Sequence, residues 1–198
     1  MSIDTYTKLI AFDSGESDLL FICRHPGVAK LKSMGRRGNK LLLTMPKYNV
    51  LNTKTVKDTK QFMIQLIDAM IHIHSKGIVF CDVKDDNIML DGDRPVIIDF
   101  GSAFIGRSSL EKDTRTTDYY AAPEAELTIR SDVWSLGVVF LLVQTKMDWR
   151  EMFSTDVKGY IGDILKKKSE INDTLINGML ETDPDKRWTL MKCKGHLH

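Results

Sequence analysis

Two short stretches carry most of the chemistry in this sequence. They are Cys81-Asp82-Val83-Lys84-Asp85-Asp86-Asn87 and, a short interval later, Val96-Ile97-Ile98-Asp99-Phe100-Gly101. The β-prone residues around them predict short strands over 78–80, 88–90 and 96–98, which leaves the polar residues in loops. Phosphoryl transfer needs groups of these kinds: one to orient the attacking hydroxyl, cations to offset charge, and oxygen ligands for Mg²⁺. The two stretches are therefore suited to handling a nucleotide phosphate.

The hydrophobic pattern changes near residue 48. Before it, short apolar runs such as 41–43 alternate with turn-like segments such as 35–39, a pattern that predicts strands. After it, apolar residues recur at helical spacing, and Thr55 and Asp58 match a capping box, so we expect a helix over 55–75. A second helix over 131–145 is apolar on nearly all sides and should be buried, and a third is expected over 171–180. The sequence predicts an α+β fold with a small strand-rich part, 1–48, and a larger helical part, 49–198.

Composition excludes several classes of protein. The 198 residues include 28 Lys and Arg against 27 Asp and Glu, a net charge of +1 that leaves no surplus for nucleic acid. The longest apolar run is shorter than the roughly 20 residues that span a bilayer, so we expect no membrane segment. The first residues do not resemble a secretory signal, and the three cysteines form no metal-binding or redox pair. We expect an intracellular protein, cytoplasmic or nuclear.

The order of three motifs resembles the protein kinase family of the eukaryotic Ser/Thr type. Asp82-x-Lys84-x-x-Asn87 looks like its catalytic loop, Asp99-Phe100-Gly101 is similar to its metal-binding triplet, and Ala122-Pro123-Glu124 looks like the end of its activation segment. The resemblance covers about residues 16–198, and Arg187 resembles the arginine that pairs with the glutamate at Glu124. It implies a bilobal fold, with a strand-rich N-lobe and a mainly helical C-lobe.

The resemblance also implies roles for the loop residues. Asp82 would accept or orient the proton of the substrate hydroxyl, and Lys84 would stabilise the transferring phosphoryl group. Asn87 and Asp99 would hold Mg²⁺. Thr117 resembles the threonine that hydrogen-bonds toward Asp82 and Lys84 in Ser/Thr-specific members. The implied activity is transfer of the ATP γ-phosphoryl group to Ser or Thr of a protein substrate.

The nucleotide base would lie against a different group of residues. By resemblance, Met89 would lie beneath the adenine and Met45 would be the gatekeeper at the end of a strand. The backbone of the following hinge residues, Pro46, Lys47 and Tyr48, would meet the base, although Pro46 offers no N–H.

The front of the chain departs from the family pattern. No glycine precedes Gly15, so the glycine-rich phosphate loop has no counterpart in this sequence. Glu16 lies nine positions before His25, which matches the family's helix glutamate, and Lys8 is the candidate for the strand lysine that pairs with it. An incidental lysine in a Thr/Tyr-rich strand is the alternative at Lys8. We expect an abbreviated N-lobe, similar to that of the trimmed kinases of large DNA viruses, and a reduced affinity for nucleotide.

Several functional hypotheses stay open at this point. The first is a working Mg²⁺-dependent Ser/Thr protein kinase. The second is a catalytically weak kinase-like protein that binds and regulates or inhibits another kinase, and self-association through the same uncovered strand surface is a third. A small-molecule kinase of the same fold, such as one for aminoglycosides or choline, is a more distant alternative.

Overall fold

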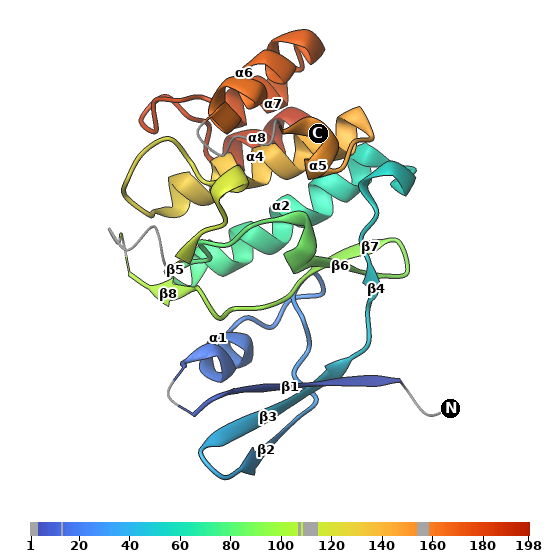
Figure 1. Cartoon of the computed structure of the whole chain (residues 1–198), viewed down its shortest axis with the longest axis vertical. Helices are drawn as coiled ribbons and strands as arrows, with labels where there is room; N and C mark the ends of the chain where they lie inside the picture. The colour runs from blue at the N-terminus through green and yellow to red at the C-terminus, as the bar shows by residue number, and fades with distance from the viewer. Residues whose placement is uncertain (1–3, 13, 107, 109–114, 154–158) are drawn as a thin grey trace.

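A computed structural model describes residues 4–12, 14–106, 108, 115–153 and 159–198. The chain forms a small sheet with one short helix, followed by a larger and mainly helical part (Figure 1). The predicted α+β class is confirmed. The small part contains β1 (Thr5–Ala11), α1 (Glu16–Ile22), β2 (Ser33–Arg37) and β3 (Lys40–Pro46).

The small sheet is antiparallel, with strand order β1-β3-β2. Alternate residues of β3, Leu41, Leu43 and Met45, are buried, because successive side chains of a strand point to opposite faces of its sheet. The turn predicted over 35–39 is shorter than expected, because β2 continues to Arg37 and only residues 38 and 39 turn, with Gly38 at φ 63°. Within the described residues β1 is an edge strand, since it pairs only with β3. The candidate lysine therefore lies on one of the two edge strands of the sheet.

The larger part is built around two long helices. Its elements in chain order are β4 (Asn49–Val50), the 3-10 turn η1 (Thr53–Thr55), α2 (Thr59–Ser75), β5 (Ile78–Val79), η2 (Asp85–Asn87), β6 (Ile88–Asp91), β7 (Arg94–Ile97), β8 (Phe104–Ile105), η3 (Asp118–Tyr120), α4 (Ile129–Thr145), α5 (Trp149–Met152), α6 (Tyr160–Ile171), α7 (Thr174–Met179) and α8 (Leu190–Leu197). The short strands form a β4-β6-β7 sheet and a β5-β8 pair. None of the described helices combines the length and apolar character that crossing a membrane requires.

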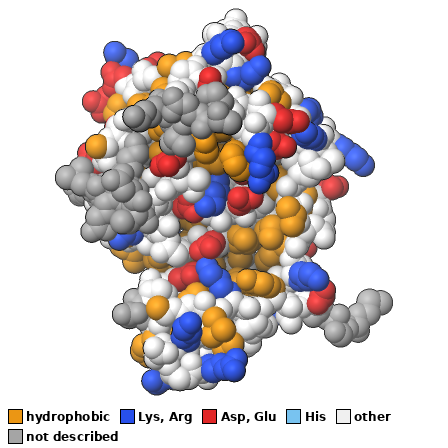
Figure 2. Space-filling model, viewed as in Figure 1, with side chains coloured by type: hydrophobic (Ala, Val, Ile, Leu, Met, Phe, Trp, Pro, Cys, Tyr) orange, Lys and Arg blue, Asp and Glu red, His pale blue; other side chains and the backbone are white. Residues whose placement is uncertain are grey.

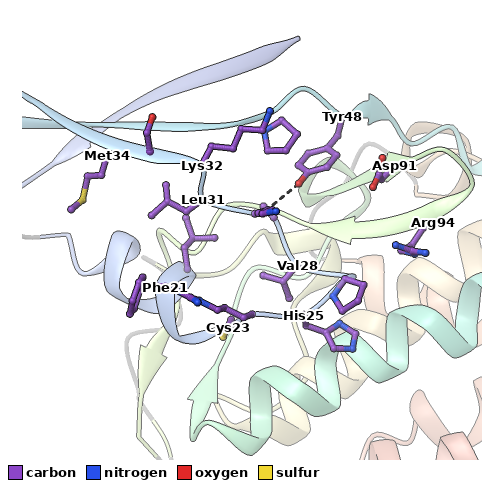
Figure 3. A pocket seen from close by; sticks show the side chains of 17 residues that line it. Phe21, Cys23, His25, Val28, Leu31, Lys32, Met34, Tyr48, Asp91 and Arg94 are labelled. Carbon is purple, nitrogen blue, oxygen red and sulfur yellow. Dashed lines mark hydrogen bonds between the residues drawn. The ribbon is translucent and has the colours of Figure 1, made fainter. Parts of the chain in front are cut away.

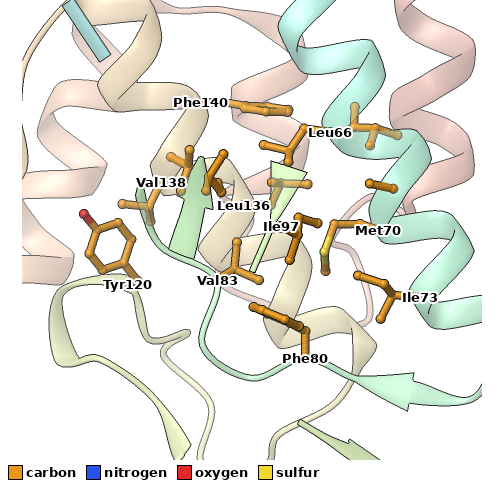
Figure 4. Packing of buried hydrophobic residues seen from close by; sticks show 14 of the residues in the cluster. Leu66, Met70, Ile73, Phe80, Val83, Ile97, Tyr120, Leu136, Val138 and Phe140 are labelled. Atoms are coloured by element: carbon orange, nitrogen blue, oxygen red, sulfur yellow. The ribbon is translucent and has the colours of Figure 1, made fainter. Parts of the chain in front are cut away.

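The buried core lies around α4, as the sequence predicts. Figure 4 shows side chains from α2, α4 and β7 gathered in one cluster, among them Leu66, Met70, Ile97, Leu136 and Phe140. Thirteen consecutive residues of α4, from 131 to 143, are buried. A helix this apolar needs neighbours on every side, and α2, α6, α7 and η3 all contact it. Phe80 and Val83 belong to the same buried cluster, so the loop that carries Asp82 is attached to this core.

Two predicted helix boundaries are wrong. The helix predicted from Thr55 begins at Thr59, because the Asp58 side chain caps it by accepting a hydrogen bond from the Gln61 N–H at 2.9 Å. The helix predicted over 171–180 begins only at Thr174, because Asn172 adopts a left-handed φ of 51° and ends the preceding helix, α6, at Ile171. Asp173 then caps α7.

Candidate active site

The loop that carries Asp82 is fixed to the helical core by Asp132. The Asp132 carboxylate accepts hydrogen bonds from the backbone N–H groups of Phe80 and Cys81, both at 2.8 Å, and lies 2.9 Å from His74 Nε2. Cys81 has φ 70°, a left-handed conformation that a non-glycine residue rarely adopts. Its two neighbours in sequence are thereby turned in different directions, with Phe80 buried and Asp82 half-buried. Asp132 holds this strained backbone in place.

The predicted catalytic residues form one closed hydrogen-bonded cluster. Asp82 Oδ1 accepts a hydrogen bond from the Thr117 hydroxyl at 2.7 Å, and Asp82 Oδ2 lies 2.8 Å from Lys84 Nζ. Lys84 Nζ also donates to Thr117 Oγ1 at 2.9 Å. Asn87 Nδ2 donates to both the carbonyl and Oδ2 of Asp82, at 2.8 and 2.9 Å. Because the Thr117 hydroxyl accepts from Lys84, its own proton goes to Asp82 and keeps that carboxylate oriented.

A second cluster contains Lys8, Glu16 and Asp99. Lys8 Nζ donates to Glu16 Oε1 and Oε2 at 2.8 and 3.0 Å, and to Asp99 Oδ1 at 2.7 Å. Asp99 has φ 61°, which aspartate tolerates better than most residues, and its Oδ1 also accepts the Gly101 N–H at 3.0 Å. A Cβ at Gly101 would lie 3.0 Å from that oxygen. The candidate strand lysine and the helix glutamate expected from its spacing to His25 are therefore brought together with Asp99, the aspartate predicted to hold Mg²⁺.

Burial separates the two acids that share Lys8. The Glu16 side chain is 3% exposed and the Asp99 side chain is 43% exposed. Burial raises the pKa of Glu16 above its usual value, against the opposing effect of Lys8. At Asp99 burial acts in the same direction, but the hydrogen bonds from Lys8 and the Gly101 N–H outweigh it and lower the pKa. Burial lowers the pKa of Lys8, yet its bonds to both acids leave that pKa raised, so the ammonium stays charged.

The two clusters are neighbours in the fold. Phe80, two residues before Asp82, meets Phe100, the residue after Asp99, in an edge-to-face contact with ring centroids 5.1 Å apart. The Lys84 ammonium also acts on the Asp99 carboxylate, where it contributes to the lowered pKa. The two clusters therefore bring three carboxylates, two ammonium groups and a carboxamide into neighbouring positions.

Asn87 and Asp99 are chemically suited to a hard cation. Among the described residues, no group of three or more His, Cys, Asp or Glu side chains is arranged to bind a metal. Mg²⁺ does not need such a group, since it is usually held by one or two carboxylates together with phosphate oxygens and water. One carboxylate from Asp99 and one carboxamide oxygen from Asn87 fit that requirement.

The residues predicted to meet the base lie at the junction of the two parts. Met45 is buried in β3, and Met89 is half-buried in β6. The Lys47 N–H donates to the Asp4 carbonyl at 3.0 Å, so it is not available to a base. Figure 2 shows hydrophobic side chains gathered between the two parts on this face, beside acidic and basic groups.

Two contacts between distant residues involve the 81–87 loop and the segment after it. Asp85 lies in an acidic run that is typical of a solvated turn, but the Tyr120 hydroxyl donates to its Oδ1 at 2.6 Å. Burial raises the pKa of Asp85 despite that bond. The expected pair between Glu124 and Arg187 is present, with two hydrogen bonds of 2.6 and 2.9 Å. Residues 107 and 109–114 of the expected activation segment lie outside the described residues.

Sequence reasoning did not identify Asp132 as a site residue. The signal was present, because Asp132 is a lone carboxylate in a helix that is otherwise apolar on nearly all sides. A buried carboxylate without partners carries a large desolvation cost, so it must be bonded to something. What the sequence does not show is that the partners are two backbone N–H groups some 50 residues earlier in the chain.

Comparison with known proteins finds similarity to several Ser/Thr protein kinases. Serine/threonine-protein kinase dkf-2 of Caenorhabditis briggsae is 28% identical over 201 residues, which cover 87% of this chain and 17% of that protein. Serine/threonine-protein kinase D2 of Homo sapiens is 33% identical over 143 residues, 63% of this chain and 16% of that protein. Serine/threonine-protein kinase PKH3 of Eremothecium gossypii is 28% identical over 221 residues, 96% of this chain and 30% of that protein. The chain thus spans less than a third of these relatives.

A family model described as the protein kinase domain matches residues 13–198. Lys8 lies outside the matched segment, so its assignment depends on its contacts with Glu16 and Asp99. The match covers nearly the whole chain, including the stretches 81–87 and 96–101. The chain belongs to the protein kinase domain family.

Proposed function

We propose that this chain is a Mg²⁺-dependent protein kinase that transfers the γ-phosphoryl group of ATP to Ser or Thr of a protein. The observation that carries the proposal is the closed cluster of Asp82, Lys84, Asn87 and Thr117, beside the Lys8–Asp99 ion pair. Family membership supports phosphoryl transfer to protein. The Lys84–Thr117 contact, together with the names of the relatives, supports Ser or Thr as the acceptor.

The reaction follows from the groups present. The substrate hydroxyl oxygen bonds to the γ-phosphorus, the bond between that phosphorus and the bridging oxygen of ADP breaks, and the hydroxyl proton passes to Asp82. Lys84 lies 2.8 Å from the Asp82 carboxylate, where its ammonium offsets negative charge on the transferring group. Mg²⁺, held by Asn87 and Asp99, would neutralise phosphate charge.

Lys8 is expected to contact the nucleotide phosphates in the same site. In the structure its ammonium is shared between Glu16 and Asp99, and its pKa is raised, so it remains a full positive charge at neutral pH. Glu16 positions that ammonium beside Asp99. The cluster therefore has cations on both sides of the region where the phosphates would lie.

The test is transfer of labelled phosphate from ATP to a generic protein such as casein, with phosphoamino-acid analysis of the product. Asp82→Asn should lower the rate by about 10²–10⁴-fold, the usual contribution of a positioned base. Asp93→Asn, which makes the same change at an exposed turn residue, should leave the rate unchanged. Omission of Mg²⁺ should abolish labelling.

The result would separate the kinase from the weak kinase-like regulator. Equal labelling by the wild type and Asp82→Asn would remove Asp82 from the mechanism. Absence of labelling by a folded wild-type chain would favour the regulator, and phosphotyrosine in the product would overturn the assignment to Ser and Thr.

A further inference from the structure

A groove with a volume of about 810 Å³ lies outside the catalytic clusters. It is bounded by α1, the segment 23–32 that follows it, the start of β2, the hinge residues and the turn between β6 and β7 (Figure 3). None of Lys8, Asp82, Lys84, Asn87 or Asp99 lines it. Its volume lies in the range of about 300–1,000 Å³ that is typical of ligand sites.

The groove is strongly basic. Four cationic side chains line it, from Arg24, Lys30, Lys32 and Arg94, against one carboxylate, Asp91. All four are exposed residues, and none forms an ion pair with a carboxylate in the described part of the chain. The molecule as a whole carries a net charge of only +1, so this concentration of unpaired positive charge is local. It attracts an anionic partner to this place.

One end of the groove is apolar. Phe21 and Met34 line it and are 61% and 58% exposed. In Figure 3, Leu31 lies between these two side chains and Arg94. The Arg24 guanidinium stacks over the Phe21 ring, 4.6 Å from its centroid. Large apolar side chains exposed together at the rim of a groove are typical of a site that binds a partner.

We propose that this groove binds an acidic peptide segment of a partner protein, with an apolar side chain of the peptide seated against Phe21 and Met34. Carboxylates of the same segment reach Lys30, Lys32 and Arg94. A nucleic acid fits less well, because the cations are interrupted by aliphatic and aromatic surface and the chain has no excess positive charge elsewhere.

The groove also touches the hinge. The Lys30 N–H donates to the Tyr48 hydroxyl at 3.1 Å, the contact drawn in Figure 3, and Pro46 lines the same groove. The Tyr48 side chain therefore belongs to the groove, whereas its backbone belongs to the segment predicted to meet the base. A bound peptide would thus contact the segment that connects the two parts of the molecule.

The test is fluorescence anisotropy with the full chain and no nucleotide, so it does not depend on phosphoryl transfer. The probe is a short labelled peptide in which glutamates alternate with leucine and phenylalanine. The double variant Lys32→Glu/Arg94→Glu should weaken binding by about tenfold or more, and added salt should weaken it further. Lys60→Glu/Lys166→Glu, the same charge change at exposed lysines elsewhere, should change binding by less than about twofold.

Apolar anchoring is tested separately. Phe21→Ser, and a peptide with serine in place of leucine and phenylalanine, should each weaken binding while the melting temperature of the chain stays unchanged. Absence of peptide binding at millimolar concentration overturns the proposal. Equal weakening by the two charge variants also overturns it, as does equal competition by an oligothymidylate of matched charge, which would indicate general polyanion binding.

Discussion

The two charged clusters of the active site are supported in different ways. Asp82, Lys84 and Thr117 lie on loops attached to α4, whose Asp132 bonds to the backbone just before Asp82. Lys8 lies on β1, an edge strand of a three-stranded sheet, and Glu16 on a helix of seven residues. The first cluster is fixed by hydrogen bonds from a helix of the core, whereas the second joins a strand and a helix of the small part to Asp99 through ion pairs.

Because the two clusters are supported differently, substitutions in them should differ in their effects on protein stability and on nucleotide binding. Changes that loosen the first cluster from the core should unfold the protein or displace the catalytic loop, because the core and the loop share Asp132. Changes at Lys8 and Asp99 should act more on nucleotide binding, because these are the partly exposed members of the second cluster. The largest expected effect on stability is at Asp132, which fixes the first cluster to the core.

Replacing Asp132 with alanine should lower the free energy of unfolding by about 3–5 kcal/mol. The change leaves two buried N–H groups without acceptors and releases the left-handed backbone at Cys81. Urea denaturation measures it, with Asp93→Ala as an exposed aspartate for comparison. A loss below about 1 kcal/mol would mean that the catalytic loop is held by something other than α4.

Asp132 also shows what a sequence can and cannot reveal. The strands, the buried helix and the order of the catalytic motifs follow from local patterns, because periodicity and turn residues act over a few positions. The partners of Asp132 and the bond from Tyr120 to Asp85 join segments far apart in the chain, so they depend on packing. Spacing alone indicated Glu16, whereas the choice of Lys8 as its partner depends on the contact between their side chains.

The starts of two helices were predicted wrongly for a related reason. Thr55 and Asp58 are both good capping residues, and the sequence does not decide between them. The structure uses Thr55 in η1, where its hydroxyl donates to the Asn52 carbonyl, and leaves Asp58 to cap α2. Over 171–180 the apolar residues keep a helical spacing, although the helix is interrupted at Asn172, where the backbone is left-handed.

Within the first cluster, Thr117→Ala should lower the transfer rate by about 10–100-fold with little change in stability. The alanine removes the hydroxyl that accepts from Lys84 and donates to Asp82, so both groups lose their orientation. Thr117→Ser keeps that hydroxyl and should restore most of the rate. Steady-state kinetics of all three chains measures the effect, and failure of serine to exceed alanine would show that the threonine methyl group matters instead.

In the second cluster, Lys8→Met and Glu16→Gln should be coupled. Lys8→Met alone leaves the Glu16 carboxyl buried without its cation, whereas the double variant removes both charges. The double variant should therefore be more stable than the sum of the single losses predicts, by about 1–2 kcal/mol. Unfolding measurements on the four chains of this cycle give the coupling. Additive losses would contradict the ion pair, whatever the effect on catalysis.

The smallest expected effect is a dependence of stability on pH. The pKa of Glu16 is raised in the folded chain. At a pH between the usual glutamate pKa and this raised value, the folded chain therefore keeps a proton on Glu16 that the unfolded chain has released. Stability therefore falls as the pH rises through this window. Asp99 has a lowered pKa and acts oppositely, since its contribution is present above the ordinary aspartate value and is lost as the pH falls through its folded pKa.

The two acids are separated by comparing variants across pH. Glu16→Gln should abolish the fall in stability just above pH 4.5, and Asp99→Asn should reduce the loss in stronger acid. Urea denaturation of the wild type and both variants at a series of pH values gives the free energy of unfolding of each chain. The difference between wild type and variant at the same pH cancels the contribution of every other titrating group. If Glu16→Gln left the pH profile unchanged, Glu16 would not be buried as a carboxylate beside Lys8, and the second cluster would be as open to water on the Glu16 side as it is at Asp99.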